Sequence, residues 1–193
     1  SPVQSWDWAN PKKLSGDEVT QFFRMLSEVD RICTDHGLIQ VLHPHLQTVV
    51  ETKSDMDRVI DNSNVKWCLD TGHMTIGGQN TVEFAKKFSD RVGHVHLKDV
   101  NMKSVPSVLA RKESIMEAVQ KGLFTPLGQG DVPILETILA LESAGYQGWY
   151  VIEQDIAISG QLPDIGEGPI VGMTESIKYL QNFVLPQLAK LGI

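Results

Sequence analysis

Four short apolar runs alternate along the chain with stretches that have the spacing of amphipathic helices. The runs cover residues 38–43, 65–70, 92–98 and 148–155, and we expect each to form a strand. The helical stretches cover residues 16–36, 54–62, 81–90, 105–120, 132–144 and 173–191. Since no hairpin signal joins two runs, each strand must reach the next through a helix. The pattern predicts an α/β fold with a parallel sheet.

Local signals refine two of these helices. Ser54 is expected to cap the helix over residues 54–62, and Pro186 is expected to bend or break the last helix near its end.

Gly77, Gly78 and the GQGD segment at residues 128–131 have two interpretations, flexible pocket rims or ordinary turns, and we favour turns.

The run VGHVHLK at residues 92–98 has a polar side chain at every second position. Successive side chains of a strand point to opposite faces, so His94, His96 and Lys98 share one face. Burying two imidazoles and an ammonium group is costly unless they have partners. This face is therefore expected to contact a bound group.

Further polar residues occur where the other predicted strands end. The candidate site residues are His43, His45, Asp70, His73, His94, His96, Lys98, Glu153 and Asp155. The C-terminal ends of strands converge on one pocket in parallel barrels and doubly wound sheets. A mixed oxygen and nitrogen donor set without thiolate suits Mn²⁺, Co²⁺, Zn²⁺, Fe²⁺ or Mg²⁺ better than a structural zinc. The sequence therefore predicts a divalent-metal site.

Each residue also has a simpler interpretation. Asp70 is explained equally well as a turn or helix cap. Glu153 and Asp155 would then end a strand in solvent, and Lys98 with Asp99 would form a surface pair of little energetic value. A lone histidine is more often a satisfied core or surface residue. Because these explanations must all hold independently at four strand ends, we favour the metal site.

Charge and motif content exclude several function classes. The chain has 24 acidic against 17 basic residues, a net charge of −7, which argues against nucleic acid or an anionic membrane as partner. No apolar run reaches the ~20 residues of a membrane span, and no signal-peptide pattern opens the chain. Nucleotide-binding glycine motifs and the GxSxG hydrolase motif are absent. Cys33 and Cys68 have apolar neighbours in the sequence and are expected to be reduced core thiols of a cytoplasmic protein, with a disulfide as the alternative.

Six motifs carry a family resemblance. HPHLQTVVET, CLDTGHMTIGG, HVHLKDV, VLAR, GLFTPLGQGDV and GWYVIEQD follow one another along nearly the whole chain. In this order they resemble the xylose-isomerase-like TIM-barrel superfamily of divalent-metal sugar isomerases and epimerases, most closely its inosose dehydratase-like branch. The resemblance implies a single domain over residues 1–193, a parallel (β/α) barrel architecture and one divalent metal ion, Mn²⁺, Co²⁺, Zn²⁺ or Mg²⁺.

The resemblance also implies roles for individual residues. Asp70, His96 and Glu153 match metal-binding positions of the family, and Glu153 also lies beside the reacting carbon. His73 and Lys98 match positions that face the bound sugar. The remaining candidates are assigned by position: His45 as a further substrate contact, His94 as support behind His96, and His43 where many members have a metal-binding glutamate. The first ligand is therefore either His43 or a water molecule.

The family barrel has eight strands, and this chain resembles only about the last five of its βα units. The opening segment SPVQSWDWAN is similar to the loop after the third strand, so the first three units are expected to be absent. An open piece of barrel exposes sheet edges. We therefore expect a shortened chain or a proteolytic remnant. A half-barrel that completes itself by dimerising is the alternative, and a homo-oligomer is compatible with it.

The implied site suits a polyol or sugar α-hydroxy ketone as small-molecule partner. The metal would polarise the carbonyl and stabilise an enediolate, Glu153 would move the α-proton, and His73 or Lys98 would stabilise oxygens. Reprotonation gives isomerisation or epimerisation, the favoured hypothesis, and loss of a β-hydroxyl gives inosose (2-keto-myo-inositol) dehydration, the alternative. A non-catalytic sugar-binding relative is a further alternative. A metal-dependent phosphodiesterase or abasic-site endonuclease would need more metal ligands and a basic groove.

Overall fold

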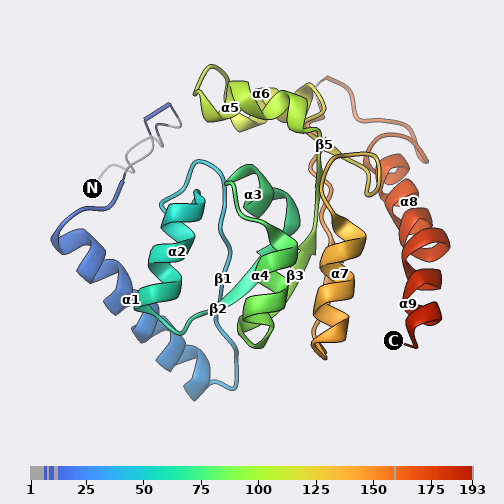
Figure 1. Ribbon diagram of the computed structural model, residues 1–193. Coiled ribbons are helices and arrows are strands. Elements are labelled where there is room, and N and C mark those ends of the chain that lie inside the picture. The colour runs from blue at the N-terminus through green and yellow to red at the C-terminus, as the bar shows by residue number, and fades with distance from the viewer. Residues whose placement is uncertain (1–6, 8, 11–12, 159, 193) are drawn as a thin grey trace.

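Figure 1 shows the computed structural model, which describes residue 7 and residues 9–10, 13–158 and 160–192. Most of the opening segment SPVQSWDWAN lies outside the described residues, so its resemblance to a barrel loop stays a prediction. No helix of the described part is long and apolar enough to cross a membrane. Both cysteines are free thiols, Cys68 buried and Cys33 half-buried, so the structure has no disulfide between them.

The sheet confirms the predicted α/β class. Its strands are β1 (Val41–Leu42), β2 (Lys66–Asp70), β3 (Val92–Leu97) and β6 (Tyr150–Ile152), in the order β1-β2-β3-β6. Every neighbouring pair is parallel. The described residues thus supply four parallel strands, where about five βα units were expected.

Helices precede, connect and follow these strands and form a curved row outside the sheet (Figure 1). They are α1 (Asp17–Asp35), α2 (Lys53–Asn62), α4 (Thr81–Phe88), α7 (Ile134–Ser143) and α8 (Pro169–Tyr179), which continues through a π-helical segment (Leu180–Val184) into α9 (Leu185–Leu191). A 3₁₀ turn, Ser89–Arg91, ends the helical stretch predicted over 81–90. The last helix starts at Pro169 rather than residue 173, and Pro186 lies in the first turn of α9, directly after the π-helical segment.

The predicted cap of α2 is wrong. Thr52, not Ser54, is the N-cap, since its hydroxyl accepts a hydrogen bond from the Asp55 N–H at 3.3 Å. The Asp55 carboxylate in turn accepts from the Thr52 N–H at 2.9 Å, which completes a reciprocal capping box. Lys53, the first helical residue, donates its N–H to the carbonyl of Gly77 at 2.8 Å. This contact with a distant segment fixes where the helix begins.

The single helix predicted over residues 105–120 is also wrong. The segment comprises a 3₁₀ turn (Met102–Ser104), α5 (Val105–Leu109) and α6 (Ile115–Gln120). Arg111, between the two helices, has a φ of 56°. A left-handed backbone conformation at a residue other than glycine ends a helix.

Two short elements have no counterpart in the sequence analysis. The helix α3 (Thr71–Ile76) follows directly on β2. The strands β4 (Asp99–Val100) and β5 (Phe124–Thr125) form an antiparallel pair across the α5–α6 segment. Because that segment separates them, no tight-turn signal marks the pair.

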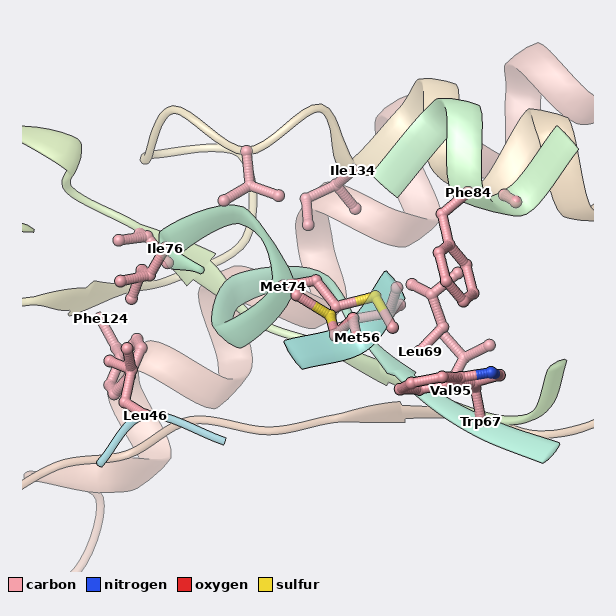
Figure 2. Packing of buried hydrophobic residues seen from close by; sticks show 14 of the residues in the cluster. Leu46, Met56, Trp67, Leu69, Met74, Ile76, Phe84, Val95, Phe124 and Ile134 are labelled. Carbon is pink, nitrogen blue, oxygen red and sulfur yellow. The ribbon is translucent and has the colours of Figure 1, made fainter. Parts of the chain in front are cut away.

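The hydrophobic core lies between the sheet and the helices. Figure 2 shows Trp67, Leu69 and Val95 of the sheet packed near Phe84 of α4, and the Trp67 and Phe84 rings meet edge to face with centroids 5.6 Å apart. These sheet residues alternate with Cys68, Asp70 and His96, which therefore point to the other face of the sheet. The packing of one face thus directs the polar residues of the other toward the interior of the curved sheet.

Candidate metal and substrate site

Asp70 is the last residue of β2 and the N-cap of α3, and its side chain is fully buried. Its Oδ1 atom accepts a hydrogen bond from the His73 N–H at 2.7 Å. Its Oδ2 atom faces His43 Nε2 at 3.2 Å and His96 Nδ1 at 3.6 Å. The carboxylate is therefore a helix cap, as the simpler interpretation held, and at the same time a member of a polar cluster.

Parallel register brings the next members together. Asp70 lies opposite His96 in the β2–β3 ladder, and the Glu153 N–H donates to the Leu97 carbonyl at 3.0 Å, extending the β3–β6 pairing by one residue. His96 Nδ1 and Glu153 Oε2 consequently lie 2.7 Å apart. Both atoms are buried, and neither makes a hydrogen bond of acceptable geometry.

His43, Asp70, His96 and Glu153 each direct one ligand atom into a common space, and these atoms all lie within 4.8 Å of one another. The two buried atoms without hydrogen bonds, on His96 and Glu153, face that space. Two imidazoles and two carboxylates form a donor set that suits a divalent transition metal. The residues present therefore fit a single divalent ion.

Mutual contacts shift the ionisation of these groups. Burial acts to raise the pKa of Asp70, but His43 and His96, with His73 and Lys98, hold it well below its usual value. Asp70, then Cys68 and Glu153, raise the pKa of His96 to about 11. Pairing with His96 lowers the pKa of Glu153 against the opposing effect of burial. In the metal-free cluster His96 is therefore protonated, and a bound cation would replace that proton.

Lys98 is fully buried beside this cluster. Its Nζ atom lies 2.8 Å from Asp155 Oδ2, 3.3 Å from Glu153 Oε2 and 3.2 Å from His73 Nε2. Burial acts to lower the pKa of Lys98, but the carboxylates of Asp70, Asp155 and Glu153 raise it above its usual value. Lys98 is thus a buried cation held among three acids.

The DTGH motif builds the site around Lys98. The Thr71 hydroxyl accepts from the Lys98 N–H and donates to the Lys98 carbonyl, both at 2.8 Å. A Cβ atom on Gly72 would lie 2.7 Å from Lys98 Cγ, so only glycine leaves room for the lysine stem. The motif therefore supplies the Asp70 carboxylate, a Thr71 hydroxyl that hydrogen-bonds to the Lys98 backbone, and at Gly72 the space that the Lys98 side chain occupies.

Three further histidines surround the cluster. His73 on α3 is buried, and burial lowers its pKa well below the usual value. The His45 ring lies against it with centroids 3.8 Å apart. The His94 ring lies 5.3 Å from that of His96, so His94 sits beside the cluster without joining the four ligand atoms. His36 lies at the exposed end of α1, outside the cluster.

The interpretation of Lys98 and Asp99 as a surface pair is wrong, because both are buried. Asp99 instead accepts hydrogen bonds from the N–H groups of Val100, Gly128, Gly130 and Val132 at 2.8–3.0 Å. These bonds hold the GQGD segment as a fixed turn.

Sequence reasoning missed the contribution of two residues. Cys68 was assigned to the core, yet its Sγ lies within 4.8 Å of ring nitrogens of His43 and His96. The signal was present, since Cys68 precedes Asp70 by two positions and shares its face of β2. Phe124, whose ring centroid lies 4.7 Å from Lys98 Nζ, carried no signal because β5 was not predicted.

A cavity of about 240 Å³ opens beside the cluster. His45, Asp155 and Ile156 line one part of it, and Ile115, Met116 and Val119 of the α6 helix line the rest. The cavity therefore combines polar groups of the site with an apolar wall.

Comparisons with known proteins agree with this architecture. The family model described as xylose isomerase-like TIM barrel matches residues 2–182. An inosose dehydratase of Clostridium perfringens (strain 13 / Type A) is 35% identical over 142 residues, 71% of this chain and 48% of the relative. An inosose dehydratase of Geobacillus thermodenitrificans (strain NG80-2) is 34% identical over 139 residues, 69% of this chain and 47% of the relative. The chain thus spans about half the length of these relatives.

Solved structures share the fold at low identity. The probable 3-DHS dehydratase AsbF of Bacillus anthracis has a TM-score of 0.64 and 18% identity, with 88% of this chain and 59% of that chain covered. The IOLI protein with a binding zinc atom has a TM-score of 0.61 and 16% identity, with 90% and 59% covered. The resemblance inferred from the six motifs is confirmed.

Proposed function

Because the chain belongs to the xylose isomerase-like TIM-barrel family, we propose that it binds one divalent metal ion and acts on a polyol ketone. The ligands are His43, Asp70, His96 and Glu153. The observation that carries the proposal is their convergence within 4.8 Å, with two buried ligand atoms that pair only with other charged groups of the site. The identity of the metal among Mn²⁺, Co²⁺, Zn²⁺ and Mg²⁺ stays a prediction, because such donor sets follow metal availability as well as affinity.

When bound, a divalent metal acts as a Lewis acid that polarises a substrate carbonyl and makes the neighbouring C–H group more acidic. The chain's own residues then handle the proton and the charge. Glu153 has a lowered pKa, so it is ionised at neutral pH and can accept the proton from the α-carbon. Its contact with His96 in the cluster supports this role.

Lys98 and His73 stabilise charge on oxygen. The Lys98 ammonium, 3.3 Å from Glu153 Oε2, donates hydrogen bonds to the oxygen that becomes negative. His73 is neutral, and when its Nε2 accepts from Lys98 its Nδ1 carries a proton that has no partner in the structure. This Nδ1–H group is available to a substrate oxygen. His45, whose ring lies against that of His73 and lines the cavity, contacts the substrate from the same side.

Two outcomes follow from the same proton removal. Loss of a β-hydroxyl group gives dehydration, and the inosose dehydratases at 34–35% identity support this outcome for an inosose-type cyclic polyol ketone. Reprotonation would give isomerisation or epimerisation, which stays a prediction. A cytoplasmic location and homo-oligomerisation also stay predictions.

Metal content and proton exchange test the proposal together. Wild type, Asp70→Asn and His96→Gln are compared by elemental analysis, with His36→Gln as the matched histidine control. Asparagine can still cap α3, so the first variant removes the charge while keeping the helix start. We expect close to one divalent ion per chain in wild type and control, and loss from both cluster variants.

The loaded chain is then incubated with 2-keto-myo-inositol in deuterated buffer. Release of water with a new carbonyl-conjugated absorbance supports dehydration, and deuterium at the α-carbon without water loss supports epimerisation. Metal binding without either reaction would favour a non-catalytic sugar-binding relative. A wild-type chain that binds no divalent ion after loading would contradict the proposal.

A further inference from the structure

Cys68 lies in β2 with a buried side chain whose surroundings are not those of an ordinary core thiol. It stands opposite His94 in the β2–β3 ladder, one strand repeat before Asp70, or about 7 Å along the strand. Its Sγ atom and ring nitrogens of His43 and His96 all lie within 4.8 Å of one another. A structural cysteine is normally surrounded by apolar groups, whereas this one faces two imidazoles.

Two ligand sets therefore share the same pair of histidines. One adds the carboxylates of Asp70 and Glu153, and the other adds the thiol of Cys68. Cys68 does not fall in one group with Asp70 and Glu153, so a cation held by His43 and His96 would take either the oxygen donors or the sulfur donor. Hard cations prefer carboxylate oxygen, and thiophilic cations prefer thiolate sulfur.

We propose that Cys68 is a metal ligand of this chain, binding thiophilic divalent cations through Sγ together with His43 and His96. Binding breaks the S–H bond, forms a sulfur–metal bond and releases the thiol proton to solvent. Mn²⁺ and Mg²⁺ use the carboxylate set alone. The inference shares two histidines with the proposed function and rests on it to that extent, but it concerns which cations the site selects rather than which reaction it performs.

Cobalt and cadmium provide readouts that are independent of catalysis. The metal-free full chain is loaded with Co²⁺ and its near-ultraviolet spectrum is recorded for the sulfur-to-cobalt charge-transfer band. The variants are Cys68→Ser and the matched control Cys33→Ser, because Cys33 lies on α1 and belongs to no ligand group among the described residues. Circular dichroism verifies that both variants are folded. The wild-type cobalt spectrum tests for sulfur ligation by itself, so the test does not depend on the folding of a variant.

We expect the band in wild type and in Cys33→Ser, and its absence in Cys68→Ser. Cys68→Ser is also expected to raise the Kd for Cd²⁺ by at least ~10-fold and to change the Kd for Mn²⁺ by less than ~2-fold, following donor preference. Bound Co²⁺ without a sulfur band in wild type would overturn the inference and leave the proposed function intact. Equal weakening of Cd²⁺ and Mn²⁺ binding would overturn it as well, since it would indicate a packing effect. A chain that binds neither Co²⁺ nor Mn²⁺ would overturn both proposals.

Discussion

The ammonium group of Lys98 and the carboxylate of Asp155 lie 2.8 Å apart, and they join a fully buried side chain that follows β3 to a half-exposed one that follows β6. The same ammonium group lies 3.3 Å from the carboxylate of Glu153. Both carboxylates attract the same ammonium group, and we infer that Asp155 positions it relative to the four-residue cluster.

Asp155→Asn tests this inference. Without the second carboxylate charge, Lys98 moves toward Glu153, and we expect the rate of substrate proton exchange to fall by ~10–100-fold, the usual effect of losing a supporting contact. Metal content should stay unchanged, since Asp155 supplies no ligand atom to the four-residue cluster. The measurement combines elemental analysis with exchange kinetics, and Asp61→Asn on the exposed face of α2 is the matched control. An unchanged rate would show that Lys98 needs no such anchor.

His96 makes the stability of the metal-free chain depend on pH. Its folded-state pKa, raised to about 11, exceeds the ~6.5 of an unfolded histidine. Its contribution to the free energy of unfolding is therefore fully present below about pH 6.5 and is lost as pH rises through the folded value. We expect urea midpoints of the EDTA-treated chain to fall from pH 6.5 to pH 9, with a smaller decrease in His96→Gln. Equal slopes in the two proteins would contradict the assignment.

Metal binding should release protons between pH 6.5 and pH 9, the range in which the stability of the metal-free chain is expected to fall. The proton that His96 holds in the metal-free cluster must leave when its Nδ1 atom binds a cation. Calorimetric titration of Mn²⁺ at pH 8 in buffers of different ionisation enthalpy is expected to report about one proton released per metal bound. His36→Gln should leave the number of released protons unchanged. If no proton is released on metal binding, His96 does not carry a proton in the metal-free chain.

Thr52→Ala and Ser54→Ala form a matched pair for the start of α2. Loss of the Thr52 hydroxyl removes the capping box and is expected to lower the free energy of unfolding by ~0.5–2 kcal/mol. Ser54 lies inside the helix and makes no capping bond, so its replacement should change stability by less than ~0.5 kcal/mol. Urea denaturation of the two variants measures both changes in the free energy of unfolding. A larger loss of stability in Ser54→Ala than in Thr52→Ala would show that Ser54 is the cap.

Gly130→Ala tests the turn held by Asp99. A Cβ atom there would lie 2.3 Å from Asp99 Oδ1 and 2.6 Å from the Val100 carbonyl. We expect a loss of ~1–3 kcal/mol in urea denaturation, because neither neighbour can move freely. Gly122→Ala, where φ is 84° and nothing lies within 4 Å, measures backbone strain alone. A larger loss at Gly122 would show that strain, not contact, dominates.

The sequence predicted the parallel sheet and the gathering of polar residues at strand ends, for a simple physical reason. Two-residue periodicity fixes which side chains share a face, and parallel strands bring their C-terminal ends to one edge. Asp70, His96 and Glu153 meet because of these two rules, which need no knowledge of distant contacts.

What the sequence left undetermined depends on distant contacts or backbone strain. Both Thr52 and Ser54 have an aspartate three residues later, so the local pattern fits either cap, and the bond from Lys53 to Gly77 decides between them. The break at Arg111 follows from a positive φ that its residue type does not announce. The β4–β5 pair joins segments too far apart in sequence for a turn signal.

Asp70 uses one carboxylate oxygen to begin α3 and directs the other toward His43 and His96. Its side-chain torsions are consequently set when the chain folds, before any cation arrives. The loss of rotational entropy belongs to folding, so a metal meets a carboxylate that is already oriented. A carboxylate oxygen held in this way would adjust little to ions of different radius, so the helix cap would make binding at this site depend on ionic size.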